Sequence, residues 1–241
     1  MVTKNQIKLV TSLQQKKYRN QHGLFVVEGL KTVQEIMESE IKPYGVFVDK
    51  EEYRFILGDS AILVSSGILS QMSSQSHPSG ILGVFYMPEL EKPTIDSWVV
   101  ALDAVRDPGN LGTIIRLCDW FNIKHLICSK DTVDCYNPKV LQATMGSIAR
   151  VNIHYLELAE FFDKNKTVPI VGTFMDGNSH YEASFFPHGI LVMGNEANGI
   201  SKPIEERISH RIGIPQFGKR TTESLNVASA TAILLNEIRR S

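Results

Sequence analysis

Residues 98–121 of the chain, WVVALDAVRDPGNLGTIIRLCDWF, contain the pattern that decides the fold. The run from Trp98 to Leu102 is uniformly apolar, which is typical of a strand that is buried on both faces. Glycines and a proline then shape a tight turn, and from Gly112 to Phe121 the apolar residues recur at helical spacing. A buried strand followed directly by a helix predicts an α/β unit with a mostly parallel sheet.

The same alternation extends to both sides of this segment. Towards the C-terminus we expect strands at 125–128, 168–174 and 189–193 and helices at 138–149 and 223–240. Towards the N-terminus we expect one or two short helices within 4–19, strands at 24–27, 46–48, 62–64 and 80–86, and helices at 29–37 and 68–72. The prediction is a small α/β domain over residues 1–90, a linker at 91–97 and an α/β domain over 98–241.

Composition restricts the class of protein. The chain has 241 residues, of which 43% are hydrophobic and 21% charged, which is ordinary for a globular protein. Its net charge of −1 gives no global positive field, so any surface for nucleic acid has to be local. The three cysteines lack metal-ligand spacing, and no signal-peptide core or membrane-length apolar run is present. We expect a cytoplasmic protein without a metal site or a membrane partner.

Chemistry is expected in the loops after Leu102, Phe174, Met193 and Ile214, because parallel sheets bind ligands at the carboxyl ends of their strands. Three of these loops have distinctive sequences. Asn110 and Arg116 follow the first, residues 194–199 (GNEANG) form the second, and residues 224–227 (SLNV) follow the last. Taken singly, each also fits a capped helix or an ordinary turn.

Taken together, the three segments resemble the SpoU/TrmH family of RNA 2'-O-methyltransferases, part of the SPOUT superfamily. The family's Asn-x-Gly-x-x-x-Arg motif is matched by Asn110, Gly112 and Arg116. The remaining matches are Gly194, Glu196 and Gly199 for Gly-x-Glu-x-x-Gly, and Ile214, Pro215 and Ser224 to Val227 for the last motif. The resemblance covers Trp98 to the end of the chain, and three motifs in this order and separation are highly specific. Residues 77–80 (HPSG) also resemble the turn that often precedes the linker in this family.

The chain departs from the family pattern at two points. Gln216 stands where the family often has Met, and the loop from Gly218 to Ser224 is longer than the usual form. The extra residues are basic and polar, so they either contact RNA or change how the loop covers the cofactor.

The resemblance implies a C-terminal domain with a deep trefoil knot, S-adenosylmethionine as the cofactor, no metal, and a homodimer with the active site near its interface. The catalytic residues that it implies are Arg116, Asn110, Glu196, Ser224 and Asn226. The cofactor contacts that it implies are Thr173, Gly194, Asn195, Ile214 and Leu225. Arg116 is the residue proposed to assist deprotonation of the hydroxyl. Since a guanidinium rarely loses its proton, electrostatic stabilisation of the alkoxide is the alternative role.

The resemblance also gives the N-terminal domain a task, because related enzymes carry a ribosomal-protein-like α/β domain that binds the RNA substrate. In the first 31 residues Glu28 is the only acid among several basic residues. The residues expected to bind RNA are Lys16, Lys17, Arg19, Arg106, Lys219 and Arg220. Ribosomal RNA is the favoured substrate because of the extra domain, and transfer RNA is the alternative.

Three other readings compete with this one. A non-catalytic RNA-binding protein on the same fold is disfavoured, because the residues of all three motifs are intact. A nucleotide-dependent oxidoreductase is disfavoured because no Gly-x-Gly-x-x-Gly follows a strand. A base methyltransferase is disfavoured by the Asn110 and Arg116 pair together with the Ser-Leu-Asn-Val segment, which favour ribose.

Overall fold

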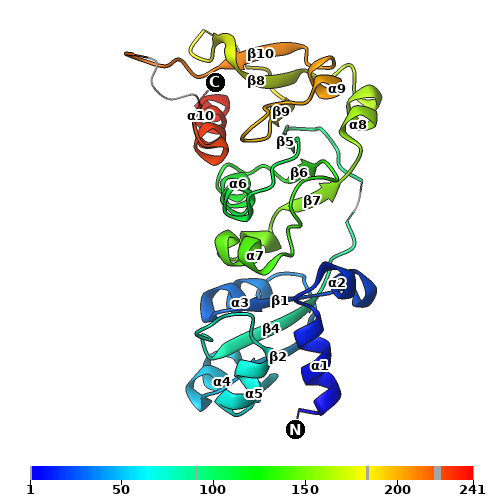
Figure 1. Cartoon of the computed structure of the whole chain (residues 1–241), viewed down its shortest axis with the longest axis vertical. Coiled ribbons are helices and arrows are strands. Elements are labelled where there is room, and N and C mark those ends of the chain that lie inside the picture. The colour runs from blue at the N-terminus through cyan, green and yellow to red at the C-terminus, as the bar shows by residue number, and fades with distance from the viewer. Residues whose placement is uncertain (1, 91, 183–184, 220–223, 241) are drawn as a thin grey trace. The chain divides into compact units, whose positions relative to one another are not determined.

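The structure is a computed structural model that describes residues 2–90, 92–182, 185–219 and 224–240. The chain divides into two compact units, each with its own sheet (Figure 1). The N-terminal unit comprises residues 1–89 and 134–150, and the C-terminal unit comprises residues 90–133 and 151–241. The predicted α/β fold is confirmed, and no helix in the described part of the chain is long and apolar enough to cross a membrane.

The N-terminal unit has a mixed four-stranded sheet in the order β1-β4-β2-β3, in which only β2 and β3 run parallel. Its strands are β1 (Leu24–Glu28), β2 (Pro43–Val48), β3 (Ala61–Leu63) and β4 (Ile81–Tyr86). Its helices are α1 (Lys4–Ser12), α2 (Lys16–His22), α3 (Leu30–Met37), α4 (Glu51–Leu57), α5 (Ser66–Met72), α7 (Pro138–Thr144) and the 3-10 helix η1 (Ser147–Ala149). A capping box between Thr3 and Gln6 starts α1, and apolar residues of α1 and α5 pack with one face of the sheet.

Residues 134–150 pack in the N-terminal unit although they follow β6 of the other unit in sequence. The rings of Phe25 and Tyr136 lie 4.7 Å apart, and Arg150 pairs with Glu35 at 2.6 Å. The single helix predicted over 138–149 is wrong, because the chain turns into left-handed backbone at Met145 (φ 51°) and Gly146 (φ 96°) between α7 and η1. The domain boundaries at residues 91–97 remain a prediction. Residues 134–150 are a second segment of the chain that belongs to the N-terminal unit.

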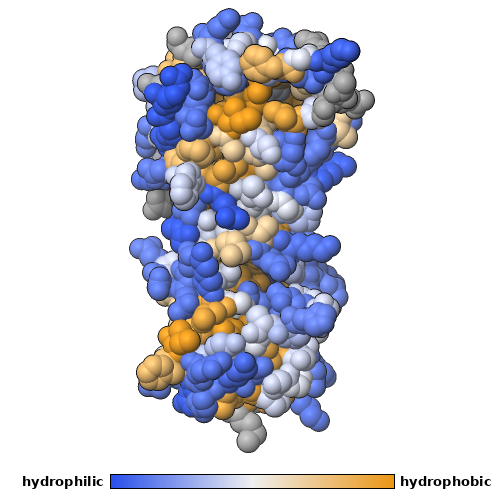
Figure 2. Space-filling view, turned by 90° about the vertical axis from the view of Figure 1, so that its left-hand side faces the viewer, coloured by the Kyte–Doolittle hydropathy of each residue, from blue (hydrophilic) through white to orange (hydrophobic). Residues whose placement is uncertain are grey.

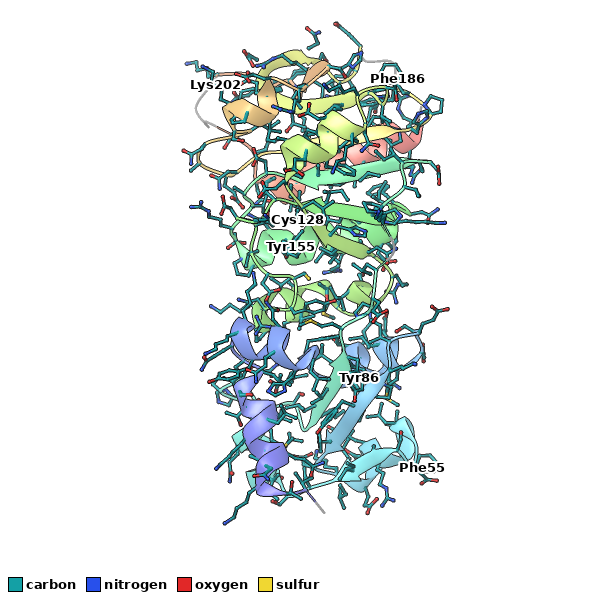
Figure 3. The ribbon with its side chains drawn as sticks, turned by 90° about the vertical axis from the view of Figure 1, so that its right-hand side faces the viewer. Phe55, Tyr86, Cys128, Tyr155, Phe186 and Lys202 are labelled. Atoms are coloured by element: carbon teal, nitrogen blue, oxygen red, sulfur yellow. The ribbon has the colours of Figure 1, made fainter. Side chains whose placement is uncertain are left out.

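The C-terminal unit has a six-stranded sheet in its described residues, with the order β10-β8-β9-β5-β6-β7, and its neighbouring strands all run parallel. Its strands are β5 (Trp98–Leu102), β6 (His125–Cys128), β7 (Asn152–Tyr155), β8 (Ile170–Ser179), β9 (Gly189–Met193) and β10 (His210–Gly213). Its helices are α6 (Pro108–Trp120), α8 (Leu158–Lys164), α9 (Lys202–Glu205) and α10 (Val227–Arg240). Cys128 and Tyr155 are register partners on β6 and β7 (Figure 3).

Helices cover both faces of this sheet. Helices α6 and α10 pack together on one side, and α8 and α9 lie on the other (Figure 1). Val99, Ala101 and Val192 share a core cluster with α8 and α9, so alternate strand residues face opposite layers. Burial on both faces explains the uniformly apolar strands from which the parallel sheet was predicted.

Candidate functional site

Four segments of the C-terminal unit emerge at one edge of its sheet, as the sequence predicted. Leu102 pairs with Met193 at the carboxyl ends of β5 and β9, and Gly172 of β8 pairs with both Val192 and Arg211. The strands are parallel, so the loops that follow them share this edge. Candidate residues far apart in the sequence are thereby brought close together.

The loop after β5 is tied to the loop after β9 by two hydrogen bonds. Asp103 is buried, and its carboxylate accepts from the backbone N–H of Ser201 at 2.7 Å. The side-chain amide of Asn195 donates to the carbonyl of Ala104 at 2.6 Å, and Ala104 itself has left-handed backbone (φ 55°). Sequence reasoning missed Asp103, although an acidic residue directly after a buried strand is a recognisable signal.

The loop from Gly194 to Ile200 closes on itself. Asn195 exchanges backbone hydrogen bonds of 2.9 Å with Gly199, and its side-chain oxygen accepts from the N–H groups of Ala197 and Asn198. A Cβ added at Gly194 would lie 2.3 Å from the carbonyl carbon of Gly199, so only glycine fits there. The side chain of Asn195 therefore organises the loop.

A chain of hydrogen bonds joins three of the predicted catalytic residues. The Nδ2 of Asn110 donates to Oε1 of Glu196 at 2.9 Å, and the Oδ1 of Asn110 accepts from Nδ2 of Asn226 at 2.8 Å. Asn226 also caps α10, because its Oδ1 accepts from the N–H groups of Ala228 and Ser229. Asn110 itself lies in the first turn of α6, whose N-cap Asp107 accepts from the Asn110 N–H at 2.8 Å.

Arg116 and Ser224, the other two predicted catalytic residues, do not join these hydrogen bonds in the described part of the structure. Arg116 is exposed on α6, and no hydrogen bond or ion pair joins it to another described residue. Ser224 is exposed directly after the segment 220–223, which lies outside the described residues together with the predicted RNA contact Arg220. Arg106 and Lys219 are both exposed, as an RNA contact requires.

The predicted cofactor residues surround the same edge. Thr173 is half-buried, and its hydroxyl donates to the Val192 carbonyl at 3.1 Å. Ile214 is half-buried after β10, while the side chains of Leu225 and Phe217 are 51% and 81% exposed. Peptide groups next to exposed apolar side chains suit an adenosine, which has a flat apolar face and a polar rim.

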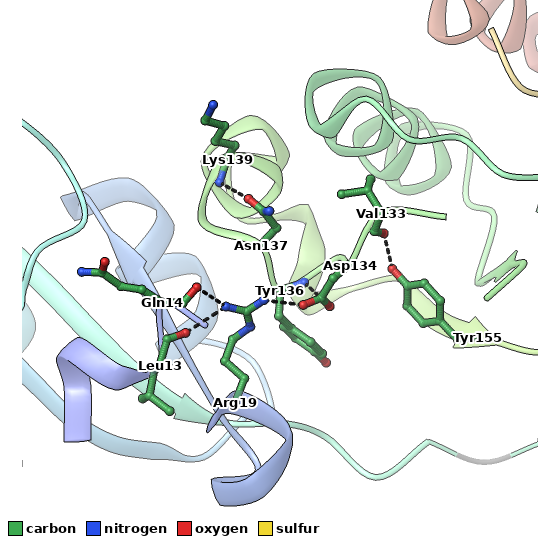
Figure 4. A network of polar contacts seen from close by, with 9 residues as sticks. All are labelled: Leu13, Gln14, Arg19, Val133, Asp134, Tyr136, Asn137, Lys139 and Tyr155. Carbon is green, nitrogen blue, oxygen red and sulfur yellow. Dashed lines mark hydrogen bonds and ion pairs between the residues drawn. The ribbon is translucent and has the colours of Figure 1, made fainter. Parts of the chain in front are cut away.

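Two of the three basic residues predicted to bind RNA in α2 are exposed, and one is buried. Lys16 and Lys17 are exposed in the first turn of α2. Arg19 is only 3% exposed, and its guanidinium donates to the carbonyls of Leu13 and Gln14 and to Asp134 (Figure 4). Arg19 therefore holds the N-terminal unit together and does not face solvent.

A separate polar pair lies away from this edge. Nδ1 of His125 and Nε2 of His154 are 3.1 Å apart, and burial together with the charge of His125 lowers the pKa of His154 to about 4. Burial and Lys124 also lower the pKa of His125. Within the described residues, no group of three or more His, Cys, Asp or Glu side chains is arranged to hold a metal ion.

Comparison with known proteins identifies both halves of the chain. Residues 97–236 match the model of the SpoU rRNA Methylase family, and residues 4–83 match the MRM3-like substrate binding domain. The 23S rRNA (guanosine(2553)-2'-O)-methyltransferase RlmP of Bacillus subtilis (strain 168) is 31% identical, over 98% of this chain and 97% of the relative.

Solved structures agree over the full length. A protein of the TrmH family from Porphyromonas gingivalis matches with a TM-score of 0.89 and 36% identity, over 100% of both chains. The AdoMet-bound rRNA methyltransferase from Sinorhizobium meliloti matches with a TM-score of 0.85 and 29% identity, over 100% of this chain and 96% of that one.

Proposed function

The chain belongs to the SpoU rRNA Methylase family, and we propose that it transfers a methyl group from S-adenosylmethionine to a ribose 2'-hydroxyl of ribosomal RNA. The observation that carries the proposal is the hydrogen-bond chain Glu196–Asn110–Asn226 at the carboxyl edge of the sheet. It connects all three sequence motifs, at the edge where parallel sheets bind their ligands.

The cofactor supplies a methyl group on a sulfonium, which is a good leaving group, so the protein has to position the hydroxyl and stabilise its developing charge. Gly194, Ile214 and Leu225 bind the cofactor through their backbones, with Thr173 and Asn195 supporting the loops around them. Arg116 faces solvent and is free to approach the RNA, where its fixed positive charge stabilises the alkoxide. Asn110, Glu196, Ser224 and Asn226 orient Arg116 and the ribose.

The active form is a homodimer with the active site near its interface. The face formed by α6 and α10 supports this proposal, because Trp120 is 84% exposed and Ile233 is 38% exposed there. Figure 2, which views the side that carries these helices, shows apolar residues gathered among polar ones in the C-terminal unit. Arg116 lies one helical turn from Trp120 on α6, so a partner on this face would meet the catalytic arginine.

Two finer features follow from the family likeness. We propose that the C-terminal segment forms the deep trefoil knot of SPOUT enzymes, a proposal supported by the full-length match to the P. gingivalis structure. We also propose that residues 1–90 act as the RNA-binding domain, joined by the linker 91–97 to the methyltransferase domain 98–241. Lys16 and Lys17 are its phosphate contacts, and Arg106, Lys219 and Arg220 extend the surface.

The name of the B. subtilis relative makes a guanosine of 23S rRNA the first candidate substrate. The match to an MRM3-like substrate binding domain favours ribosomal RNA over transfer RNA, which remains the alternative. A cytoplasmic location is part of the proposal and rests on the bacterial relative, whose name gives 23S rRNA as its substrate.

The experiment is methyl transfer from labelled S-adenosylmethionine by the purified protein, offered unmodified 23S rRNA and total transfer RNA in parallel. We expect label in 23S rRNA at one 2'-oxygen, mapped by resistance to alkaline cleavage, and loss of that mark in a deletion strain. Label in transfer RNA alone would replace the proposed substrate. Cofactor binding without transfer to either RNA would favour the non-catalytic RNA-binding protein.

A further inference from the structure

Strand β8 leaves the sheet at the cofactor edge and then returns to it. It pairs with β9 only through residues 170–172. It pairs with β10 at Val171 and Gly172 and again at Asn178 and Ser179, whereas the four partners in β10 are consecutive residues. Residues 173–177, which we call the excursion, are therefore extra residues of β8, opposite the step from Arg211 to Ile212 in the neighbouring β10 (Figure 1).

The excursion fits tightly against the backbone that leads to the cofactor loop. A Cβ at Gly177 would lie 2.3 Å from the carbonyl carbon of Ile212, and a Cβ at Gly213 would lie 2.7 Å from the carbonyl oxygen of Phe174. The excursion begins at Thr173, whose hydroxyl bonds to the end of β9, and it packs on the residue before Ile214. Its conformation therefore fixes Ile214, a proposed cofactor contact, and Thr173, which supports the loops around the cofactor.

Arg211 of β10 clamps the excursion at two points. Its guanidinium carbon lies 3.5 Å from the centroid of the Phe174 ring, which is the geometry of a stacked cation–π contact. Its Nη2 donates to Asp176 at 2.9 Å, and its Nη1 donates to Glu205 of α9 at 2.5 Å. Both hydrogen bonds raise the pKa of Arg211, so the clamp stays charged.

The Phe174 ring is also restrained from within the unit. A Cβ at Gly172 would lie 2.7 Å from a ring carbon of Phe174, and Phe174 packs against the same core cluster as Ile208. Asp176 is 79% exposed, so its ion pair with Arg211 contributes little to global stability. The contacts of Arg211 instead select one conformation of the excursion.

We propose that Arg211 is a positioning residue for S-adenosylmethionine: through Phe174 and Asp176 it holds Thr173 and Ile214 in the conformation that binds the cofactor. The inference rests on the proposed function, because it assigns the cofactor to this edge. Arg211 lies outside the three motifs that identify the family.

The test compares Arg211→Ala and Arg211→Lys with the matched control Arg207→Ala. Arg207 forms a comparable, partly exposed ion pair with Asp163 of α8 at 2.9 Å, which does not involve residues 173–177. By calorimetry we expect Arg211→Ala to bind S-adenosylmethionine about fivefold more weakly than wild type. Arg211→Lys should fall in between, because it keeps the charge but loses the flat stacking face. Arg207→Ala should bind as wild type.

Hydrogen exchange of the ligand-free proteins supplies a second readout. Faster exchange of residues 173–177 and 212–215 in Arg211→Ala, but not in Arg207→Ala, supports the clamp. Unchanged binding by Arg211→Ala, or equal weakening by both alanine variants, overturns the proposal. If wild type fails to bind the cofactor, the proposed function fails and this role of Arg211 fails with it, while exchange still shows whether the clamp exists. If Arg211→Ala does not fold, Arg211→Lys decides by the same two measurements.

Discussion

Replacing Asn110 tests whether the bond chain at the carboxyl edge serves catalysis. The Asn110 side chain makes one hydrogen bond to Glu196 and one to Asn226, at 2.9 and 2.8 Å. With a net ~1 kcal/mol for each bond, Asn110→Ala removes about 2 kcal/mol of positioning. If that loss falls on the transition state, kcat drops about 30-fold. The site is solvent-accessible, so water replaces much of the bonding in the resting enzyme, and Tm should fall by no more than about 4 °C.

Asn110→Asp separates the polarity of the contact from its size. The variant can still accept from Asn226, but it places a carboxylate against Glu196, where the amide now donates. At pH 8 repulsion between the two carboxylates should make kcat lower than in Asn110→Ala. Repulsion between two adjacent carboxylates raises the pKa of one of them, so that the pair takes up a shared proton as the pH falls. Activity relative to wild type should therefore recover at lower pH.

The assay is the initial rate of methyl transfer to 23S rRNA at saturating cofactor and RNA, with cofactor affinity measured separately. Asn152→Ala is the control, since Asn152 is exposed at the start of β7, at the opposite edge of the same sheet. A wild-type kcat in Asn110→Ala would refute the catalytic role of the hydrogen bonds that join Glu196, Asn110 and Asn226. So would an Asn110→Asp variant that is at least as active as Asn110→Ala at pH 8.

The remaining predictions concern charge. Arg116→Ala should abolish methyl transfer and leave cofactor affinity by calorimetry unchanged; retained turnover would exclude the catalytic role. Lys16→Glu with Lys17→Glu should weaken RNA binding and reduce the slope of log affinity against log salt by about 2, and an unchanged slope would count against phosphate contacts there. His154 is buried with its pKa lowered from 6.5 to about 4, so the folded state favours the neutral ring. The neutral ring of His154 stabilises the folded state fully above pH 6.5, and this stabilisation is lost as the pH falls towards 4. The free energy of unfolding, measured in urea, should therefore decrease less over that range in His154→Gln than in wild type.

The strands most clearly predicted from the sequence are those whose residues are buried on both faces. β6 and β9 have the predicted bounds, because a short apolar run leaves little choice of where the strand begins and ends. β7, which contains Asn152 and His154, and β10, which begins with His210 and Arg211, were not assigned as strands. Both lie at the ends of the sheet order, where one side of the strand has no partner and polar residues are tolerated.

Helix starts were misplaced for a local reason. α6 begins at Pro108 rather than at Gly112, because Asp107 caps it and proline suits a first turn. α10 was predicted from Glu223, which lies outside the described residues, whereas the described helix starts at Val227 after the cap Asn226. At α6 the cap Asp107 accepts from the N–H of the catalytic candidate Asn110, and at α10 the cap Asn226 is itself a catalytic candidate, so the turn that ends each loop also places a functional side chain.

The candidate site was predictable as a set of residues but not as a set of contacts. Sequence order placed Asn110, Glu196 and Asn226 in loops at one edge, because parallel strands bring their carboxyl ends together. Which amide donates to which oxygen depends on side-chain geometry across 86 and 116 residues of chain, and no local pattern encodes that. The same limit applies to Arg19, which looked like a member of a basic surface until its partner Asp134, 115 residues away, proved to bury it. A positive charge in a basic segment therefore indicates an RNA contact only where the side chain is exposed. By that criterion Lys16 and Lys17 are candidates for charge reversal, whereas replacing the buried Arg19 should unfold the unit.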